Sequence, residues 1–254
     1  MVKKTLVALF ILLAAAAASI VWAAKVQSVL FHSAYWGLIA AVVVGAAAGV
    51  AKALAGRKRQ PGTDAPRHSL GSFLEHWGTG MGIIILIVSA ALLSSGRKIG
   101  FIVVPEIARS RIMALNLHYL GALFTVLFGC FFLADFLVSG SYKKLLPNLT
   151  DIRDGTLKRY LLGKKWLDTG KYAVTQKWAF LAMAILGGIV LVTGFIKTSF
   201  FIWAVPINAA TTLHDYSSEL FFIMLIIHVL FVVALPAHWR LLLSLFTGKE
   251  PNKH

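Results

Sequence analysis

The chain has 254 residues, of which 58% are hydrophobic and 14% charged, a composition typical of proteins with several membrane spans rather than of soluble domains. Its single cysteine, Cys130, excludes an internal disulfide, a cysteine-ligated iron–sulfur cluster and covalent haem attachment. The net charge of +15 does not indicate nucleic-acid binding, because the basic residues flank apolar runs, where they meet lipid headgroups.

The N-terminal part contains two apolar runs. Residues 1–24 carry Lys3 and Lys4 ahead of an uncharged, alanine-rich run, which predicts either a cleavable signal peptide or a first transmembrane helix. The run at 34–55 has a small residue at every fourth position, from Gly37 to Ala53, a pattern typical of closely packed helices in lipid. Residues 56–73 form a basic linker. These two spans show no residue pattern that indicates chemistry.

Four further apolar runs predict a four-helix core within residues 74–248. They lie at about 74–95, 114–138, 177–197 and 212–235, and each is long enough for a membrane-spanning helix, which needs about 20 residues. The charged loop 139–176 includes a predicted surface helix at 157–166, and residues 239–246 predict an amphipathic helix at the membrane surface. We therefore expect an all-α integral membrane bundle, with this core and one or two extra N-terminal helices.

The distribution of basic residues predicts the orientation. When the six spans alternate in direction, 19 of the 25 Lys and Arg residues fall on one side and 6 on the other. Cytoplasmic loops are enriched in Lys and Arg. The loop 139–176 and the C-terminus are therefore expected on the cytoplasmic side.

The last core span contains two histidines, His214 and His228, separated by fourteen residues. At about 100° and 1.5 Å per residue they leave the same helix face about 21 Å apart. Ionisable side chains inside membrane spans usually face the protein interior and carry function. Two interpretations remain open: each histidine is a buried residue bonded to a neighbouring helix, or each gives Nε2 to a haem iron.

The haem interpretation requires two more histidines at matching depths. His76 starts the first core span on the cytoplasmic side, and His118 starts the second on the outer side. The predicted depths of the four histidines in the membrane pair His118 with His214 near the outer surface, and His76 with His228 near the inner surface. Two axial histidines leave iron no open coordination position, which suits electron transfer rather than oxygen activation.

Other residues near these histidines fit a haem site but also have simpler roles. Gly78, Gly80, Gly82 and Gly121 either give room for a flat macrocycle or serve helix contact. Arg111, on the outer side, is placed either to pair with a haem propionate or to anchor its helix at the membrane surface.

The core, about residues 70–248, resembles the cytochrome b (gamma) subunit of respiratory formate dehydrogenases, within the broader dihaem cytochrome b561-like family. The resemblance rests on the sequences around two histidines, SFLEHWGTG at His76 and NLHYLGAL at His118, and on the histidine pair of the last span. It extends to Gly170–Gly194, which reads GKYAVTQKWAFLAMAILGGIVLVTG and resembles the family's entry to the third span, with Thr-Gly near its end.

The resemblance implies two haem b groups in the bacterial cytoplasmic (inner) membrane. Electrons would pass from a catalytic subunit through an iron–sulfur subunit, both on the outer side, to the outer haem, the inner haem and a quinone, either menaquinone or ubiquinone. Gln176 and Lys177 match positions near the family's quinone site, but the family's asparagine is Ala173 here. The quinone is therefore held differently, or the inner haem passes its electrons to another acceptor.

Three alternatives stay open on the sequence. The chain could serve a hydrogenase or a thiosulfate-type reductase instead, since those complexes use related cytochromes b. A haem-free transporter subunit could use the same histidines to relay protons, and a purely structural membrane anchor would need none of them. If the chain is an electron-transfer subunit, catalysis on the outer substrate belongs to a partner subunit.

Overall fold

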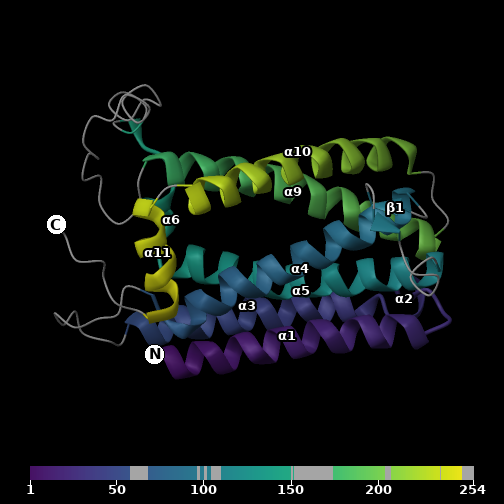
Figure 1. The fold of residues 1–254 in the computed structure, drawn as a ribbon, viewed down its shortest axis with the longest axis horizontal. Coiled ribbons are helices and arrows are strands. Elements are labelled where there is room, and N and C mark those ends of the chain that lie inside the picture. Colours follow the sequence, from purple (N-terminus) through teal and green to yellow (C-terminus); the bar gives the residue numbers. More distant parts are fainter. Residues whose placement is uncertain are drawn as a thin grey trace. The chain divides into compact units, whose positions relative to one another are not determined.

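The computed structural model describes residues 1–57, 68–95, 98–99, 102–103, 110–149, 151, 174–203, 207–234 and 236–247. These residues form two compact units, the first made of Met1–Ser139 with Ala237–His254 and the second of Gly140–Pro236. Figure 1 labels their elements. The first unit holds α1 (Val2–Lys25), α2 (Leu30–Ser33), α3 (Trp36–Arg57), α4 (Leu70–Ser95), β1 (Lys98–Ile99), β2 (Ile102–Val103), α5 (Arg111–Val138) and most of α11 (Pro236–Thr247). The second holds α6 (Tyr142–Leu145), α9 (Val174–Trp203) and α10 (Asn208–Ala234).

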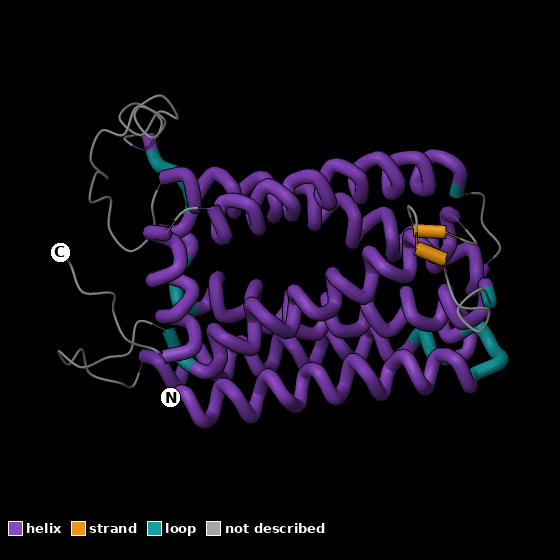
Figure 2. Tube along the Cα trace, viewed as in Figure 1, coloured by secondary structure: helices purple, strands orange, loops and turns teal. Residues whose placement is uncertain are grey.

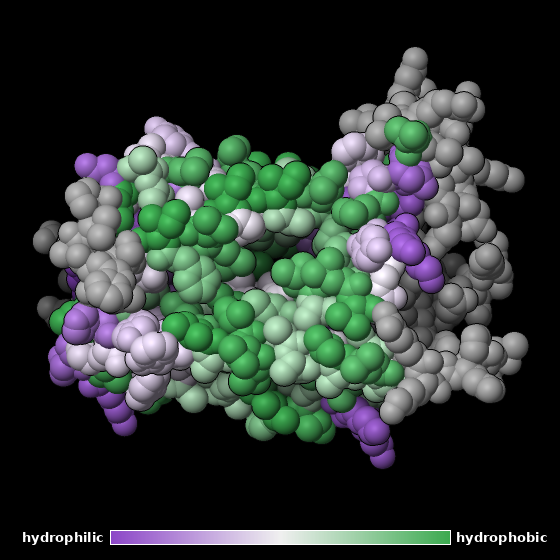
Figure 3. Space-filling model, turned by 180° about the vertical axis from the view of Figure 1, so that it is seen from behind, coloured by the Kyte–Doolittle hydropathy of each residue, from purple (hydrophilic) through white to green (hydrophobic). Residues whose placement is uncertain are grey.

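Six helices among the described residues have the length and apolar composition to cross a membrane, namely α1, α3, α4, α5, α9 and α10. The only strands described are the two-residue pair β1 and β2, which are antiparallel and drawn in orange in Figure 2. The predicted all-α membrane bundle is therefore confirmed. Large apolar side chains such as Phe10, Val43 and Leu230 are exposed, and Figure 3 shows apolar residues covering the helix sides while polar ones gather toward helix ends.

Helix α5 is the central element of the first unit, because α3 and α4 both pack along it and α1 contacts both α4 and α5. The buried face of α1 is a stripe with three- and four-residue spacing, made of Thr5, Ala8, Leu12, Ala16, Ser19 and Ala23. Such a stripe is the packing face of a helix.

Glycines allow these helices to pack at close range. A Cβ added to Gly45 of α3 would overlap the carbonyl oxygen of Leu127 in α5, and one added to Gly49 would overlap that of Phe131. The small-residue stripe predicted at 34–55 is thus a helix contact, which lipid-embedded helices use to gain van der Waals packing.

Polar residues set where the histidine-bearing helices begin and end. Ser69 Oγ accepts from the Ser72 N–H at 3.2 Å at the start of α4, and Ser110 Oγ accepts from the Met113 N–H at 3.4 Å at the start of α5. These are N-caps, which satisfy donors that lack an intrahelical partner. Gly140, at φ 75°, follows the end of α5 and takes the left-handed conformation common after helices.

The connection between α1 and α3 is fixed to α5 by two buried side chains. Asn116 Oδ1 accepts from the Leu30 N–H at 2.9 Å, while its Nδ2 donates to the carbonyls of Val26 and Ser28 at 3.2 and 3.0 Å. Tyr119 Oη donates to the Ala34 carbonyl at 2.5 Å. The connection between the two helices outside the family resemblance is therefore bonded to residues that flank His118.

The segment predicted as an amphipathic surface helix at 239–246 is helical and belongs to α11. Its Phe246 ring packs on Phe73 and Trp77, with ring centroids 5.4 and 5.8 Å apart. Thr5 Oγ1 donates to the Phe246 carbonyl at 3.1 Å. Helix α11 thus lies across the end of the first unit at the starts of α1 and α4 (Figure 1). The predicted surface helix at 157–166 lies outside the described residues.

Candidate functional site

His118 lies near the start of α5, and its ring is held by a hydroxyl of α4. Its Nδ1 lies 3.0 Å from Ser89 Oγ. The Ser89 hydroxyl also donates to the Leu86 carbonyl at 3.0 Å. With the hydroxyl proton on that carbonyl, the Ser89 oxygen can accept a hydrogen bond from the Nδ1–H of His118.

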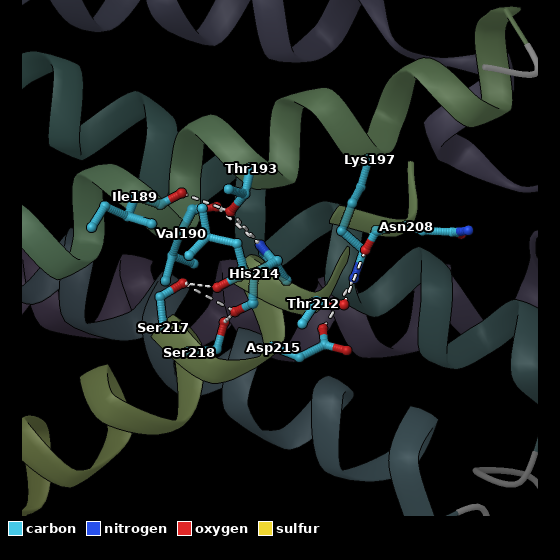
Figure 4. Close-up of polar contacts among 11 residues, drawn as sticks. Ile189, Val190, Thr193, Lys197, Asn208, Thr212, His214, Asp215, Ser217 and Ser218 are labelled. Carbon is cyan, nitrogen blue, oxygen red and sulfur yellow. Dashed lines mark hydrogen bonds and ion pairs between the residues drawn. The ribbon is translucent and has the colours of Figure 1, made fainter. Parts of the chain in front are cut away.

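His214 lies near the start of α10, and its ring is held in the same way by α9. Its Nδ1 lies 3.1 Å from Thr193 Oγ1 and 3.1 Å from the Val190 carbonyl. Thr193 Oγ1 donates to the Ile189 carbonyl at 2.6 Å. Figure 4 shows these groups converging on one edge of the imidazole. A carbonyl only accepts, so Nδ1 of His214 carries the proton and Nε2 is the ring nitrogen with a lone pair for a ligand.

The absence of a side chain at Gly194 leaves room for the His214 ring. A Cβ at this position would lie 3.3 Å from Cε1 of His214, which is tighter than ordinary contact. The Thr193-Gly194 dipeptide therefore has one residue that bonds the ring and one that makes room for it.

Of the remaining two predicted ligands, His76 lies near the start of α4 and His228 lies near the end of α10. His76 of α4 is exposed, and His228 of α10 is half-buried. One turn after His76, a Cβ at Gly80 would meet nothing within 4 Å among the described residues. By contrast, Gly78 packs on Phe128. In the same way Gly82 and Gly121 lie at contacts between α4 and α5. Of the four glycines considered, three serve helix contact and Gly80 leaves the histidine face open.

The two candidate haem ligands of each unit are spaced alike along the helix axis. Ser89 lies beside His118 and follows His76 on α4 by thirteen residues, which is about 20 Å at 1.5 Å per residue. His214 and His228 are fourteen residues apart on α10, or about 21 Å. In both units the two candidate ligands are therefore separated by most of the length of a membrane-spanning helix, on α4 and α5 in the first unit and on α10 alone in the second.

Lys177, a predicted quinone contact, is engaged in a buried ion pair. Its Nζ lies 2.7 Å from Asp151 Oδ2, and the two residues are only 5% and 4% exposed. Asp151 and Asn148 also bond each other's backbone N–H groups. Burial by itself raises the pKa of the Asp151 carboxyl, but the bonds from Lys177 and Asn148 and the Lys177 charge outweigh it, so this pKa lies below its ordinary value.

The other two predicted site residues differ in exposure. Gln176, next to Lys177, is half-buried, and Arg111 is exposed at the start of α5. An exposed arginine there is compatible with either a propionate partner or a membrane-surface anchor. Ala173 lies outside the described residues.

A charged cluster inside the first unit was not singled out from the sequence. Lys52 Nζ of α3 lies 2.6 Å from Glu75 Oε2 of α4 and 2.9 Å from Asp135 Oδ2 of α5. Glu75 Oε1 and Trp77 Nε1 are buried without a hydrogen-bond partner in the described part of the chain. The available signal was the presence of three charged residues within predicted spans, since charges at membrane depth are usually paired.

Ser89 and Thr193 were also missed as candidate site residues. A hydroxyl inside an apolar helix most often bonds its own backbone, so neither residue stands out in the sequence. The signal that existed was Thr193-Gly194, which belongs to the segment quoted for the family resemblance.

The donor set of these histidines fits a haem better than a metal ion bound by side chains alone. Within the described residues, no group of three or more His, Cys, Asp or Glu side chains could hold a metal ion. A haem iron needs only two protein ligands, each a neutral imidazole whose other nitrogen is fixed by a hydrogen bond. His118 and His214 are both bonded at Nδ1, so they meet this requirement.

Together the fold and these contacts define a multi-pass helical membrane protein with histidines near both ends of its spans. Comparison with known protein families, with curated proteins and with solved structures finds no match.

Proposed function

We propose that this protein is a dihaem b electron-transfer subunit of a membrane oxidoreductase. The observation that carries the proposal is the equal axial spacing of two histidines in each unit, about 20 Å and 21 Å by helix rise. A polar side chain at membrane depth is costly, and four histidines at two depths are not needed for packing. The Nδ1 bonds of His118 and His214 add support, because they present Nε2 for ligation.

The proposed ligand pairs follow from sequence depth: His118 with His214 for the outer haem, and His76 with His228 for the inner haem. When bound by two histidines, haem iron supplies one-electron transfer without an open coordination position. The protein's own part is to hold two imidazoles at each depth and to keep the apolar span between them dry. Arg111 is the proposed partner of an outer propionate.

The family resemblance extends the proposal to partners. An iron–sulfur subunit and a catalytic subunit, formate dehydrogenase-like, would deliver electrons on the outer side, and a quinone would receive them at the inner side of a bacterial cytoplasmic membrane. Gln176 and Lys177 are the proposed quinone contacts. Because an ammonium has three N–H donors, Lys177 can donate to a quinone while it holds Asp151.

One observation favours a second candidate of another class. The buried cluster of Lys52, Glu75 and Asp135 joins three helices and leaves Glu75 Oε1 unbonded within the described residues. Buried carboxylates inside membranes often serve proton relays. A haem-free proton-relaying transporter subunit therefore remains the alternative.

Haem content separates the two functions. We expect the purified protein to contain two noncovalent haems per chain and to show sharp b-type bands in its reduced-minus-oxidised spectrum. His118→Ala and His214→Ala should each remove the same haem, and His76→Ala and His228→Ala should each remove the other. His32→Ala, at an exposed histidine of α2, is the matched control and should keep both haems.

Two results would overturn the proposal. A wild-type protein, folded and inserted, that binds no haem would favour the transporter. Loss of both haems from a stable His76→Ala variant would show that the ligand pairs are assigned wrongly.

A further inference from the structure

The two outer histidines, His118 and His214, are held by the same arrangement although they belong to different units. In each case a hydroxyl on the preceding helix bonds Nδ1, at 3.0 Å for Ser89 and 3.1 Å for Thr193. In each case that hydroxyl also bonds a carbonyl of its own helix. Both hydroxyl residues are buried, Ser89 at 0% and Thr193 at 4% exposure.

These contacts differ from ordinary hydroxyl bonding inside helices. Thr125 of α5 bonds the Gly121 carbonyl at 2.9 Å, and Thr198 of α9 bonds the Phe195 carbonyl at 2.6 Å. Such back-bonding satisfies the hydroxyl and needs no further partner. Ser89 and Thr193 make this bond as well and, in addition, place the hydroxyl oxygen within hydrogen-bond distance of an imidazole Nδ1.

With each hydroxyl proton on a helix carbonyl, the hydroxyl oxygen is the acceptor available to the imidazole. The oxygen accepts, Nδ1 donates, and the neutral ring carries its lone pair at Nε2. The Val190 carbonyl enforces the same tautomer at His214 independently, since it can only accept. An Nδ1–H bond to an acceptor also orients the ring and makes its other nitrogen more basic.

We propose that Ser89 and Thr193 are positioning residues for the two axial ligands of the outer haem, and that they lower its reduction potential. The inference rests on the proposed function. A more basic axial nitrogen donates more charge to the iron and so stabilises the ferric state. The two hydroxyls therefore make the outer haem a better electron donor than the same histidines would without them.

The first test uses the protein without haem, so that it does not depend on haem loading. Nitrogen NMR of histidine-labelled protein in lipid distinguishes the two neutral tautomers. We expect the resonance of His214 to report the Nδ1–H form in the wild type. A resonance of the Nε2–H form would overturn the inference, whatever the haem content of the chain.

The second test measures the potentials of both haems by redox titration. Ser89→Ala and Thr193→Val each remove one hydroxyl with little change of volume. We expect each to raise the midpoint potential of one haem, the one lost in His118→Ala, and to leave the other unchanged. The electron paramagnetic resonance signal of that same ferric haem should shift, because the ligand rings lose a constraint on their orientation.

Matched controls and conservative variants separate positioning from folding. Thr125→Val and Thr198→Val remove hydroxyls of the same kind that bond only a carbonyl in the described contacts, and both should leave the two potentials unchanged. Ser89→Thr and Thr193→Ser keep a hydroxyl and should restore the wild-type potential. Haem-loaded Ser89→Ala and Thr193→Val proteins with unchanged potentials would disprove the role of the hydroxyls, whereas a wild type without haem would disprove the proposed function instead.

Discussion

Lys177 is a buried cation at the start of the membrane-spanning part of α9. Its charge is neutralised by Asp151, whose Oδ2 lies 2.7 Å from the Lys177 Nζ. A buried charge without its partner is strongly destabilising, whereas removal of both charges costs much less. Loss of quinone turnover in a Lys177 variant could therefore arise from either binding or folding. The ion pair supplies a way to tell the two apart.

We expect Lys177→Met to destabilise the protein by about 3 kcal/mol, because Asp151 is left as an unpaired buried carboxylate. The double variant Asp151→Asn with Lys177→Met should recover most of that loss. Thermal unfolding in detergent measures the stability of the single and the double variant relative to the wild type. If the stable double variant still transfers electrons to quinone at the wild-type rate, Lys177 is structural and not a quinone contact.

The same pair has a defined dependence on pH. The pKa of Asp151 is lowered in the folded protein, so its contribution to stability is present above the ordinary aspartate pKa, about 3.9. The contribution is lost as pH falls through the lowered folded value. The stability difference between wild type and Asp151→Asn should stay constant from about pH 5 to 8 and shrink only below about pH 4.

At the scale of the elements, close approach of α3 to α5 depends on glycines that face backbone rather than side chains. A Cβ at Gly45 would overlap the Leu127 carbonyl, while a Cβ at Gly56 of the same helix would meet nothing within 4 Å among the described residues. A backbone carbonyl cannot rotate out of the way as a flexible side chain can. A side chain at position 45 would therefore force α3 and α5 apart.

We expect Gly45→Ala to lower the unfolding free energy by about 2 kcal/mol, the usual cost of overpacking. Gly56→Ala should be neutral or stabilising by up to about 1 kcal/mol, because alanine is the better helix former. Melting temperatures of the two variants provide the measurement. Equal melting temperatures would mean that α3 does not pack on α5 at Gly45.

Helix α3 is also tied to its neighbours by charge. Lys52 joins Glu75 and Asp135, and its stem would meet a Cβ at Gly71. Asn116 and Tyr119 make the corresponding ties at the other end, through the connection between α1 and α3. Helix α3 is thus bonded to α4 and α5 through Lys52, and the connection between α1 and α3 is bonded to α5, which carries His118.

At the scale of the whole molecule, the proposed direction of electron flow depends on which side of the membrane each loop faces. The basic residues predict that the connection after α1 is outside and that α6 is cytoplasmic. The single native cysteine, Cys130, allows a cysteine-free background with one substitution.

In that background, we expect Ser28→Cys to react with a membrane-impermeant thiol reagent added to intact cells, and Lys143→Cys to react only after the membrane is opened. Both positions are exposed, so accessibility depends on the side of the membrane and not on burial. Labelling of Lys143→Cys in intact cells would invert the topology and place the proposed iron–sulfur partner on the cytoplasmic side.

The amino-acid sequence by itself was sufficient for the four core spans, the all-α class and the positions of the four histidines along their helices. These features depend on length, hydropathy and helix rise, which are properties of a single segment in lipid. For the same reason the small-residue stripe of α3 could be recognised as a packing face before its partner helix was known.

The tertiary structure alone decided which residues bond one another across helices. The glycines near His76 had two possible roles in the sequence, and only the placement of α5 showed that Gly78 and Gly82 serve contact while Gly80 does not. Likewise, Ser89 and Thr193 look like ordinary back-bonding residues until the register of neighbouring helices brings them to His118 and His214. A hydrogen bond requires two groups within about 3 Å, and the rotation and register that create this proximity are set by the packing of whole helices rather than by any local pattern.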